Sequence, residues 1–316
     1  IAGRLKGEML IFLSVWNIIT HRNFNTLYED STCGGWSAVC QTGETMFKVL
    51  KEIINEHISY KEQIISLAKV DIAKDFKGSG LGWLWAFVKP MMTIFVFWFA
   101  ITIGFRGSKA IDGIICPYFL WLVVGMVTWF YMRDMIFSGA SCFRRYKQLV
   151  TKIKFPVSVI PTFVSLSNMY SHILLMGGVV VMFFCFGFPP SVYWLQLPLY
   201  TAFMLLFTII WSMVTGLLSV VSRDFHNMLK AMVSAIFWLS GILFNVKSIP
   251  YLWIRRLFYF NPVTYIVEGY RNCFTRHIWF FEQWKQLLCF LFVLFVFAMV
   301  ALWLYKRLRK EIPDVL

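Results

Sequence analysis

The sequence predicts an all-helical integral membrane protein with six transmembrane helices, and three observations support this class. Of the 316 residues, 59% are hydrophobic and only 15% are charged, which leaves too little polar surface for a water-soluble core of this size. Apolar runs of about 20 residues, the length that crosses a bilayer, recur along the chain. The net charge of +14 is divided among short segments between these runs, a pattern typical of membrane topology and not of nucleic-acid binding.

Residues 1–45 differ from the rest of the chain. They begin with Ile1 rather than Met, and Arg4 and Lys6 precede the apolar stretch 9–19, which imitates a signal peptide. No small-x-small cleavage site follows Ile19, and cleavage there would leave a Lys-rich segment outside the membrane. We therefore expect residues 1–45 to be a non-native or disordered extension and Met46 to be the true start.

Residues 46–76 have the pattern of an amphipathic helix. Apolar residues such as Phe47, Leu50 and Ile54 recur at steps of three and four, and Lys and Glu occupy the other faces. Such a helix is expected to lie in the membrane interface rather than to cross the bilayer. The alternative is a solvated helix that packs against a partner.

Residues 77–316 are predicted to form the transmembrane domain. Lys89 and Pro90 fall within the first two turns of the first span, where a lysine side chain reaches the interface. Residues 155–222 contain no Asp, Glu, Lys or Arg, and we divide them into two spans at Pro189-Pro190, because paired prolines do not continue a helix. The six predicted spans are Leu84–Phe105, Pro117–Ser138, Val157–Phe186, Leu197–Val221, Met228–Phe244 and Gln286–Tyr305.

The segment between the fifth and sixth spans is apolar but is interrupted by several charges. It predicts two short helices, 251–260 and 263–275, separated at Asn261-Pro262. A helix break at membrane depth is tolerated only against protein or water, so we expect a re-entrant hairpin that lines a path. In the alternative interpretation, Glu268 and Arg271 merely neutralise each other within the second helix.

The distribution of Lys and Arg orients the bundle. With the N-terminus inside, the cytoplasmic segments hold 18 of these residues, whereas the outer segments hold eight, six of them in the re-entrant stretch. The positive-inside rule then places both termini in the cytoplasm.

The loop after the second span, residues 141–154, combines an apolar stripe with five positive charges. Phe143, Tyr146 and Val150 lie on one helical face, and Pro156 follows the segment and stops the helix. A basic amphipathic helix of this kind either anchors to lipid headgroups or acts as a lever that docks in a groove of a cytoplasmic partner.

Several short motifs occur in a characteristic order between Met46 and Leu316. They are 77–85 followed by Lys89-Pro90, then 154–161, 191–196, Arg223-Asp224-Phe225, Asn261-Pro262, 268–271, 279–282 and 314–316. In these residues the chain resembles the ABC exporter permeases for polysaccharides and teichoic acids, and it looks closest to the teichoic acid translocation permeases. Residues 1–45 lie outside the resemblance.

The resemblance implies a permease that pairs with a second copy of itself and with two ABC ATPase subunits. The sequence agrees in one respect, because it contains no G-x-x-x-x-G-K-[ST] phosphate cradle, so ATP and Mg²⁺ are expected on the partner ATPase. The resemblance also implies a location in the bacterial cell membrane, of a Gram-positive organism, and a substrate of wall teichoic acid linked to undecaprenyl diphosphate. The alternative substrate is another lipid-linked polysaccharide, O-antigen or capsule.

The resemblance further implies roles for three segments. Residues 141–154 correspond to the family's coupling helix and 247–276 to its outer gate helices. The turn at Arg223-Asp224-Phe225-His226 is similar to the family's second cytoplasmic contact, and in the alternative interpretation Arg223 and Asp224 are only an ion pair that caps a helix junction. The implied ATPase-coupling residues are Phe143, Arg144, Arg145, Tyr146, Lys147, Leu149, Val150, Arg223 and Asp224. The implied outer-gate residues are Arg255, Arg256, Asn261, Pro262, Glu268 and Arg271.

A lipid-linked anionic polymer needs a lined path, because each unpaired polar group costs several kcal/mol in hydrocarbon. Aromatic rings stack on sugars, and Lys or Arg near the entrance holds phosphate. The path residues that we predict are Lys77, Lys89, Trp98, Phe99, Trp121, Trp129 and Tyr131. In the alternative interpretation these aromatic residues form interfacial belts or face lipid and core.

Two other classes compete with an ATP-driven exporter. An ion-coupled carrier usually needs intramembrane carboxylates, whereas Asp134 and Asp224 lie at span ends. A membrane-embedded transferase acting on a lipid-linked sugar needs clustered catalytic groups, but the five His and seven Cys are scattered. We therefore expect no catalytic residue and no metal site, and we interpret His172 as a polar contact between helices rather than a proton relay.

Overall fold

The computed structural model describes residues 35–76, 84–106, 116–153, 155–309 and 312. Helix is the only regular secondary structure in these ranges. Contacts divide the chain into two compact units, residues 1–51 and 52–316. Helix α2 (Gly35–Ser59) begins in the first unit, and the contacts described below lie within the second unit. The prediction for the extension up to residue 34 lies outside the described residues.

Within the part of the chain that the structure describes, five segments are long and apolar enough to cross a membrane. They agree with five of the six predicted spans to within a few residues at most ends, but the second continues to Arg145, well beyond the predicted Ser138. The helices that form them are α4 (Trp85–Phe99) with η2 (Ala100–Arg106), α5 (Tyr118–Arg145), η3 (Val157–Val159) with α7 (Ile160–Cys185), η4 (Val192–Gln196) with α8 (Leu197–Val221), and η7 (Phe280–Gln283) with α12 (Trp284–Leu308).

The predicted span over Met228–Phe244 is not confirmed. Helix α9 (Arg223–Trp238) has 16 residues and ends before the predicted span does. A turn follows, in which Gly241 has a φ of +63°, a conformation that glycine adopts without steric cost. Apolarity continues through this turn, which is why the sequence alone does not show where the helix ends.

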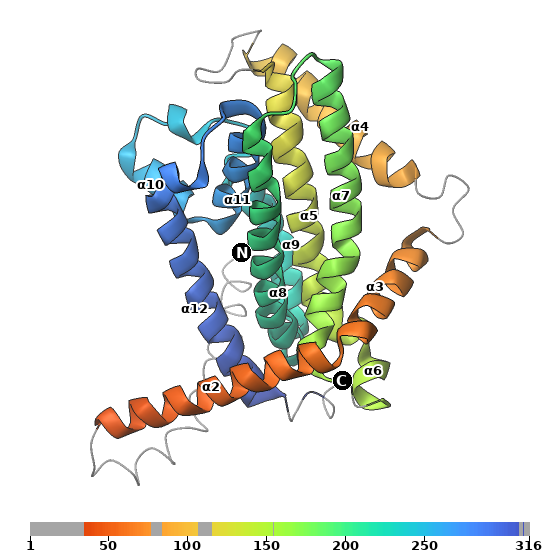
Figure 1. Cartoon of the computed structure of the whole chain (residues 1–316), viewed down its shortest axis with the longest axis vertical. Helices are drawn as coiled ribbons and strands as arrows, with labels where there is room; N and C mark the ends of the chain where they lie inside the picture. The colour runs from red at the N-terminus through yellow and green to blue at the C-terminus, as the bar shows by residue number, and fades with distance from the viewer. Residues whose placement is uncertain (1–34, 77–83, 107–115, 154, 310–311, 313–316) are drawn as a thin grey trace, which may run out of the picture. The chain divides into compact units, whose positions relative to one another are not determined.

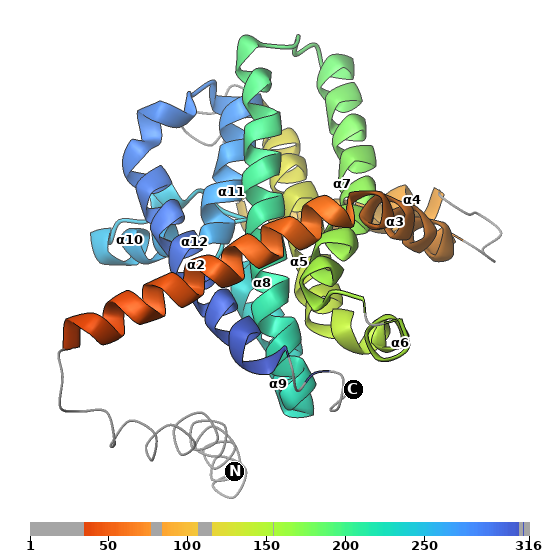
Figure 2. The same ribbon diagram turned by 60° about the horizontal axis from the view of Figure 1, so that its bottom comes forward.

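Helix α5 is the centre of the bundle. Most of its side chains are buried, because α4, α7, α8, α9 and α11 pack around it, and α12 packs on the outside of α8. Figures 1 and 2 show α7 and α8 running side by side along α5. Small residues allow the closest approach of α5 and α8, because a Cβ at Gly216 would lie 2.8 Å from the ring of Phe143.

The predicted interface segment forms the second half of α2 and helix α3 (Lys61–Phe76), with a break at Tyr60. Helix α3 packs against α7, and Asp71 accepts hydrogen bonds from Tyr146 and from Ser167, the latter at 2.9 Å. Ile58 and Ile65 remain exposed. The segment therefore packs on its own chain while part of its apolar surface stays uncovered.

A hairpin of short helices lies between α9 and α12. It comprises η5 (Val246–Ser248), α10 (Leu252–Phe260), α11 (Pro262–Arg271) and η6 (Asn272–Arg276). The predicted break at Asn261-Pro262 is confirmed: the Asn261 side chain accepts a hydrogen bond from the Val263 N–H at 3.0 Å, and Pro262 occupies the first helical position. Two short helices result in place of one span.

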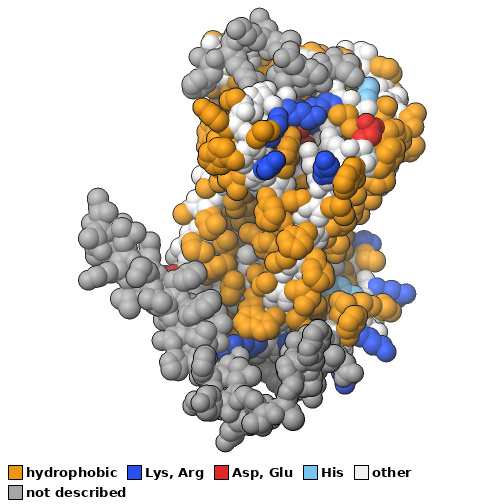
Figure 3. Space-filling model, turned by 90° about the vertical axis from the view of Figure 1, so that its left-hand side faces the viewer, with side chains coloured by type: hydrophobic (Ala, Val, Ile, Leu, Met, Phe, Trp, Pro, Cys, Tyr) orange, Lys and Arg blue, Asp and Glu red, His pale blue; other side chains and the backbone are white. Residues whose placement is uncertain are grey.

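The outer surface of the second unit is apolar along the helices. Figure 3 shows hydrophobic side chains over the middle of one face, with Lys and Arg side chains nearer its two ends. On α12 the exposed side chains include Phe292, Phe295 and Met299. This distribution is typical of a bundle that faces lipid along its middle and water at its ends.

Candidate functional site

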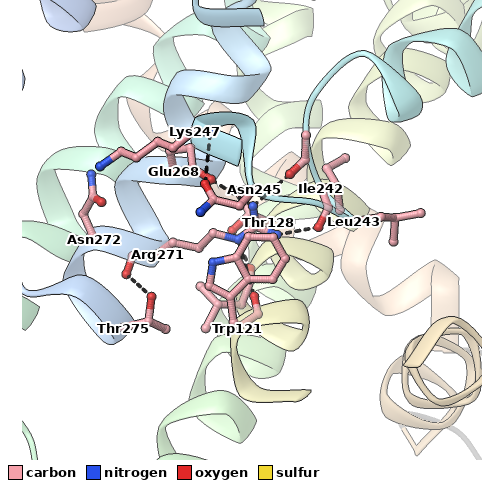
Figure 4. A network of polar contacts seen from close by, with 12 residues as sticks. Trp121, Thr128, Ile242, Leu243, Asn245, Lys247, Glu268, Arg271, Asn272 and Thr275 are labelled. Carbon is pink, nitrogen blue, oxygen red and sulfur yellow. Dashed lines mark hydrogen bonds and ion pairs between the residues drawn. The ribbon is translucent and has the colours of Figure 1, made fainter. Parts of the chain in front are cut away.

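A buried charge network holds the α10–α11 hairpin to the bundle (Figure 4). The Arg271 guanidinium lies over the ring of Trp121 on α5, 3.4 Å from the ring centroid. It donates hydrogen bonds to the carbonyl oxygens of Gly241 and Ile242 in the turn after α9, the first at 3.0 Å. One side chain therefore joins α11, α5 and this turn.

Glu268 supplies the opposite charge. Its carboxylate pairs with Arg271 at 3.0 Å and also with Arg276, which in turn donates to Asn245 Oδ1 at 2.9 Å. Burial raises the pKa of Glu268, but the charges of Arg276 and Arg271 outweigh burial and lower that pKa overall. The ion pair between Glu268 and Arg271 that their spacing suggested is therefore present, and Arg276 is a third member that the sequence did not indicate.

The local sequence makes room for this network. Gly125 faces the guanidinium from α5, and a Cβ at that position would lie 2.8 Å from Arg271 Cζ. The left-handed turn at Gly241 presents its carbonyl to the same group. These two glycines could not be assigned a partner from the sequence, because nothing in the sequence relates them to Arg271.

The other predicted gate residues lie around this network. Asn261 donates from its side chain to the Leu239 carbonyl at 3.1 Å and so ties the hairpin to the end of α9. Arg255 is half-buried and Arg256 is exposed on α10. The network positions the hairpin, and the gating role of these residues stays a prediction.

The predicted coupling segment is not one helix. Helix α5 continues to Arg145, a break follows at Tyr146, and α6 (Lys147–Thr151) is a separate turn of helix. The break has a physical cause: the Tyr146 hydroxyl donates to Asp71 on α3, and its ring packs edge-on against Phe163, 4.8 Å between centroids. Burial and the neighbouring Asp71 both raise the pKa of Tyr146.

The side chains of this segment divide into two groups. Phe143, Tyr146 and Val150 are buried inside the chain, Leu149 is half-buried, and Arg144 donates to the Ser219 carbonyl on α8. The exposed side chains are Arg145, Lys147, Gln148, Lys152 and Ile153. The apolar stripe therefore anchors the segment from inside, while the basic residues form its surface. Asp224 is exposed in the first turn of α9, and the side chain of Arg223 is outside the described part of the chain.

The predicted path residues are not gathered in one place. Trp121, Trp129 and Tyr131 are buried in the core around α5. Phe99 is exposed on the outside of α4, and Trp98 packs edge-on against Phe119 at 5.6 Å between centroids. Only Lys89 and Tyr131 line the same cavity, and Lys77 falls outside the described residues. In this conformation the two core tryptophans offer no surface to a path.

Among the cavities lined by described residues, two of about 410 Å³ each lie along α5 and α7. The first lies against α4 and includes Lys89, Arg133 and His172 in its lining. The second lies toward α6 and includes Asp71, Arg145 and Lys230. Asp134 and Asn168 line both, so the polar lining is continuous from one cavity to the next.

Polar side chains also join the helices in the core. His172 Nε2 lies 3.1 Å from the Tyr270 hydroxyl, which lies 2.6 Å from Thr201 Oγ1. Tyr131 likewise bonds Ser165 at 2.8 Å. His172 is therefore a polar contact between helices, as predicted. Among the residues that the structure describes, no group of three or more His, Cys, Asp or Glu could hold a metal.

The fold defines a polytopic helical membrane protein whose helices pack around one central span. Residues 62–275 match the model of the ABC-2 type transporter family, and because this match extends over more than half of the sequence, the chain belongs to that family. It is therefore a membrane-embedded permease subunit of an ABC-2 type transporter.

Named relatives share most of their length with this chain. It is 25% identical over 226 residues to an O-antigen export system permease protein, RfbA, of Myxococcus xanthus, covering 71% of this chain and 85% of that protein. It is 24% identical over 261 residues to the RfbA protein of Klebsiella pneumoniae, covering 80% of this chain and 94% of that protein. The relationship therefore includes nearly the whole of these permeases.

The sequence analysis assigned no functional role to Asn168 or Arg133. A signal was available for Asn168. Asn168 and His172 are polar residues four positions apart in a predicted span, so they share one helical face. Polar residues within a span generally face the bundle interior or a water-filled cavity rather than lipid.

Proposed function

We propose that the chain is the permease subunit of an ATP-driven exporter for a lipid-linked polysaccharide. The observation that carries this proposal is the family match over residues 62–275, together with relatives that are named as O-antigen export permeases over most of their length. The five apolar helices give the chain the means to surround or border a path.

The identity of the polymer is the finer part of the proposal. The named relatives favour O-antigen or a similar polysaccharide, whereas the motifs at 77–85 and 191–196 favour wall teichoic acid. Both polymers are carried on a polyprenyl diphosphate, so both require a path that accepts phosphate and sugar.

The assembly that we propose contains a second copy of the chain and two ABC ATPase subunits that bind ATP and Mg²⁺. The end of the bundle that holds α6 would face the cytoplasm and the ATPases, and the α10–α11 hairpin would lie at the outer end, with both termini inside. The exposed basic surface formed by Arg145, Lys147 and Lys152 supports the first placement.

The proposal is tested by purifying the chain in mild detergent from membranes that express its neighbouring genes. A near-stoichiometric ATPase partner, and ATP hydrolysis that requires both chains, are expected. Supplying the reconstituted complex with lipid-linked teichoic acid and with lipid-linked O-antigen, and measuring ATP-dependent translocation of each, identifies the polymer. A chain that purifies without an ATPase contradicts the exporter proposal and favours the transferase class.

A further inference from the structure

The first of the two cavities, between α4, α5 and α7, has an unusual lining for a site within an apolar bundle. We name it the α4–α5–α7 groove and define it by Lys89, Arg133, Asp134, Asn168 and His172. All five residues lie on segments that are apolar enough to span a membrane. Polar side chains at such positions are costly unless they serve a polar occupant or one another.

The charge balance of the groove favours an anion. Its lining contains two cations and one carboxylate, whereas the neighbouring cavity contains two cations and two carboxylates. Of these two cavities, the groove is therefore the one whose lining has an excess of positive charge, and the surrounding apolar helices strengthen its field.

The two cations of the groove have partners within the chain but can still bind another acceptor. The Lys89 ammonium lies over the Trp85 ring at 5.5 Å, its only partner among the described residues, and the side chain is exposed. Arg133 stacks on Phe130 at 5.2 Å and donates from Nε and Nη2 to Asp134 Oδ1 at 2.9 and 2.8 Å. A guanidinium has five N–H donors, so three remain for another acceptor.

The groove extends from one end of the bundle toward its middle. Asn168 and His172 lie about 12 and 18 Å along α7 from Ile160, at a rise of about 1.5 Å per residue. A hydrocarbon layer is about 30 Å thick, so polar groups are available across roughly half of it. The apolar face of α4, with Phe95 and Val96 exposed, adjoins the groove and offers a surface to an acyl or prenyl chain.

We infer that the α4–α5–α7 groove binds the phosphate of a lipid headgroup, with Lys89 and Arg133 as its cationic partners and the lipid tail against α4. The inference rests on the proposed function, because a polyprenyl diphosphate is the anionic lipid that the exporter must accept. A bilayer phospholipid presents the same chemistry. Phosphate esters suit a lysine point charge beside an arginine fork, which is the pair that the groove provides.

The experiment measures lipid binding to the purified full chain in uncharged maltoside micelles by native mass spectrometry. The probes are undecaprenyl diphosphate, phosphatidylglycerol and inorganic phosphate. Lys89→Gln and Arg133→Gln are each expected to weaken binding of the diphosphate lipid roughly ten-fold, since one charge-assisted contact contributes about that factor. Lys285→Gln is the matched control, because Lys285 is exposed and lies over Trp284 at the same 5.5 Å.

Asp134→Asn adds a second test, because a groove with a purely structural role would not bind the lipid more strongly when this carboxylate is removed. Removal of the carboxylate releases the Arg133 donors and raises the net charge of the groove, so binding of the diphosphate lipid is expected to strengthen several-fold. Each variant must elute as the same monodisperse species as the unaltered chain, which separates loss of binding from loss of folding.

The outcomes distinguish the sources of phosphate. The same pattern with phosphatidylglycerol, at equal affinity, supports the phosphate site and assigns it to bilayer lipid. Binding that is unaffected by Lys89→Gln and Arg133→Gln, or that is confined to inorganic phosphate, overturns the inference. The binding assay contains no ATPase, so its result does not depend on the exporter proposal. That proposal fails in a different experiment, when no ATPase purifies with the chain.

Discussion

The Arg271 guanidinium lies over the Trp121 ring, 3.4 Å from its centroid, although 150 positions separate the two residues. This contact places a full positive charge inside the bundle, where it is balanced by Glu268 and by carbonyl oxygens of the turn after α9. These contacts therefore join the hairpin, the central helix and this turn into one structural unit.

Arg271→Gln is expected to destabilise the protein strongly. The variant leaves Glu268 with Arg276 alone and empties the face of Trp121, and breaking a buried ion pair costs about 3 to 5 kcal/mol. Arg271→Lys keeps the charge but cannot make the forked contacts, so an intermediate loss is expected. Thermal unfolding in detergent measures both, with Arg256→Gln, on the exposed side of α10, as the control. Equal midpoints for Arg271→Gln and Arg256→Gln contradict the role.

Gly125→Ala is expected to act through the same contact. The added Cβ would lie 2.8 Å from Arg271 Cζ, so the guanidinium must move away from its partners. We expect a loss of about 1 to 3 kcal/mol, typical of overpacking. In the double variant with Arg271→Gln this penalty should largely disappear, which a double-mutant cycle detects as a coupling energy. Simple additivity of the two losses would show that Gly125 acts elsewhere.

The stability of the hairpin is expected to depend on pH through Glu268. Arg276 and Arg271 hold the pKa of this carboxyl below its unfolded value of about 4.3, despite the opposing effect of burial. The stabilisation is thus fully present above pH 4.3 and is lost as pH falls through the folded pKa. The difference in unfolding midpoint between the unaltered chain and Glu268→Gln should therefore shrink on acidification. A difference that grows toward low pH would reverse the sign and refute the assignment.

Five spans and the break at Asn261-Pro262 followed from the sequence because apolar length and proline placement are local properties. The predicted span that includes Leu239 and Phe244 was not confirmed, because an apolar turn and an apolar helix have the same composition and cannot be told apart by it. The surface that each apolar side chain contacts was harder to predict from the sequence. Trp121 was predicted to line a path and Phe143 to dock on a partner, but both side chains are fully buried. Periodicity identifies an apolar face, but it does not say whether that face meets lipid, a partner or the chain's own core.

The same distinction decides how the loop after α5 should be tested. Phe143→Asp or Tyr146→Asp would place a charge inside the chain, beside Gly216 or Phe163, so a loss of export would report unfolding rather than loss of docking. The exposed residues Arg145 and Lys147 are the appropriate targets.

Arg145→Glu combined with Lys147→Glu reverses two charges on the surface and leaves the buried side chains of Phe143, Tyr146 and Val150 unchanged. If this surface meets the ATPase, the double variant should fold normally, with an unfolding midpoint within about a degree of the unaltered chain, since surface changes are usually within about 0.5 kcal/mol. It should retain at least ten-fold less ATPase on co-purification, because opposed charges at an interface cost several kcal/mol. Arg256→Glu with Lys285→Glu, at the predicted outer end, is the control with the same change in charge. Equal ATPase retention by the two double variants would show that the ATPase contacts another part of the chain.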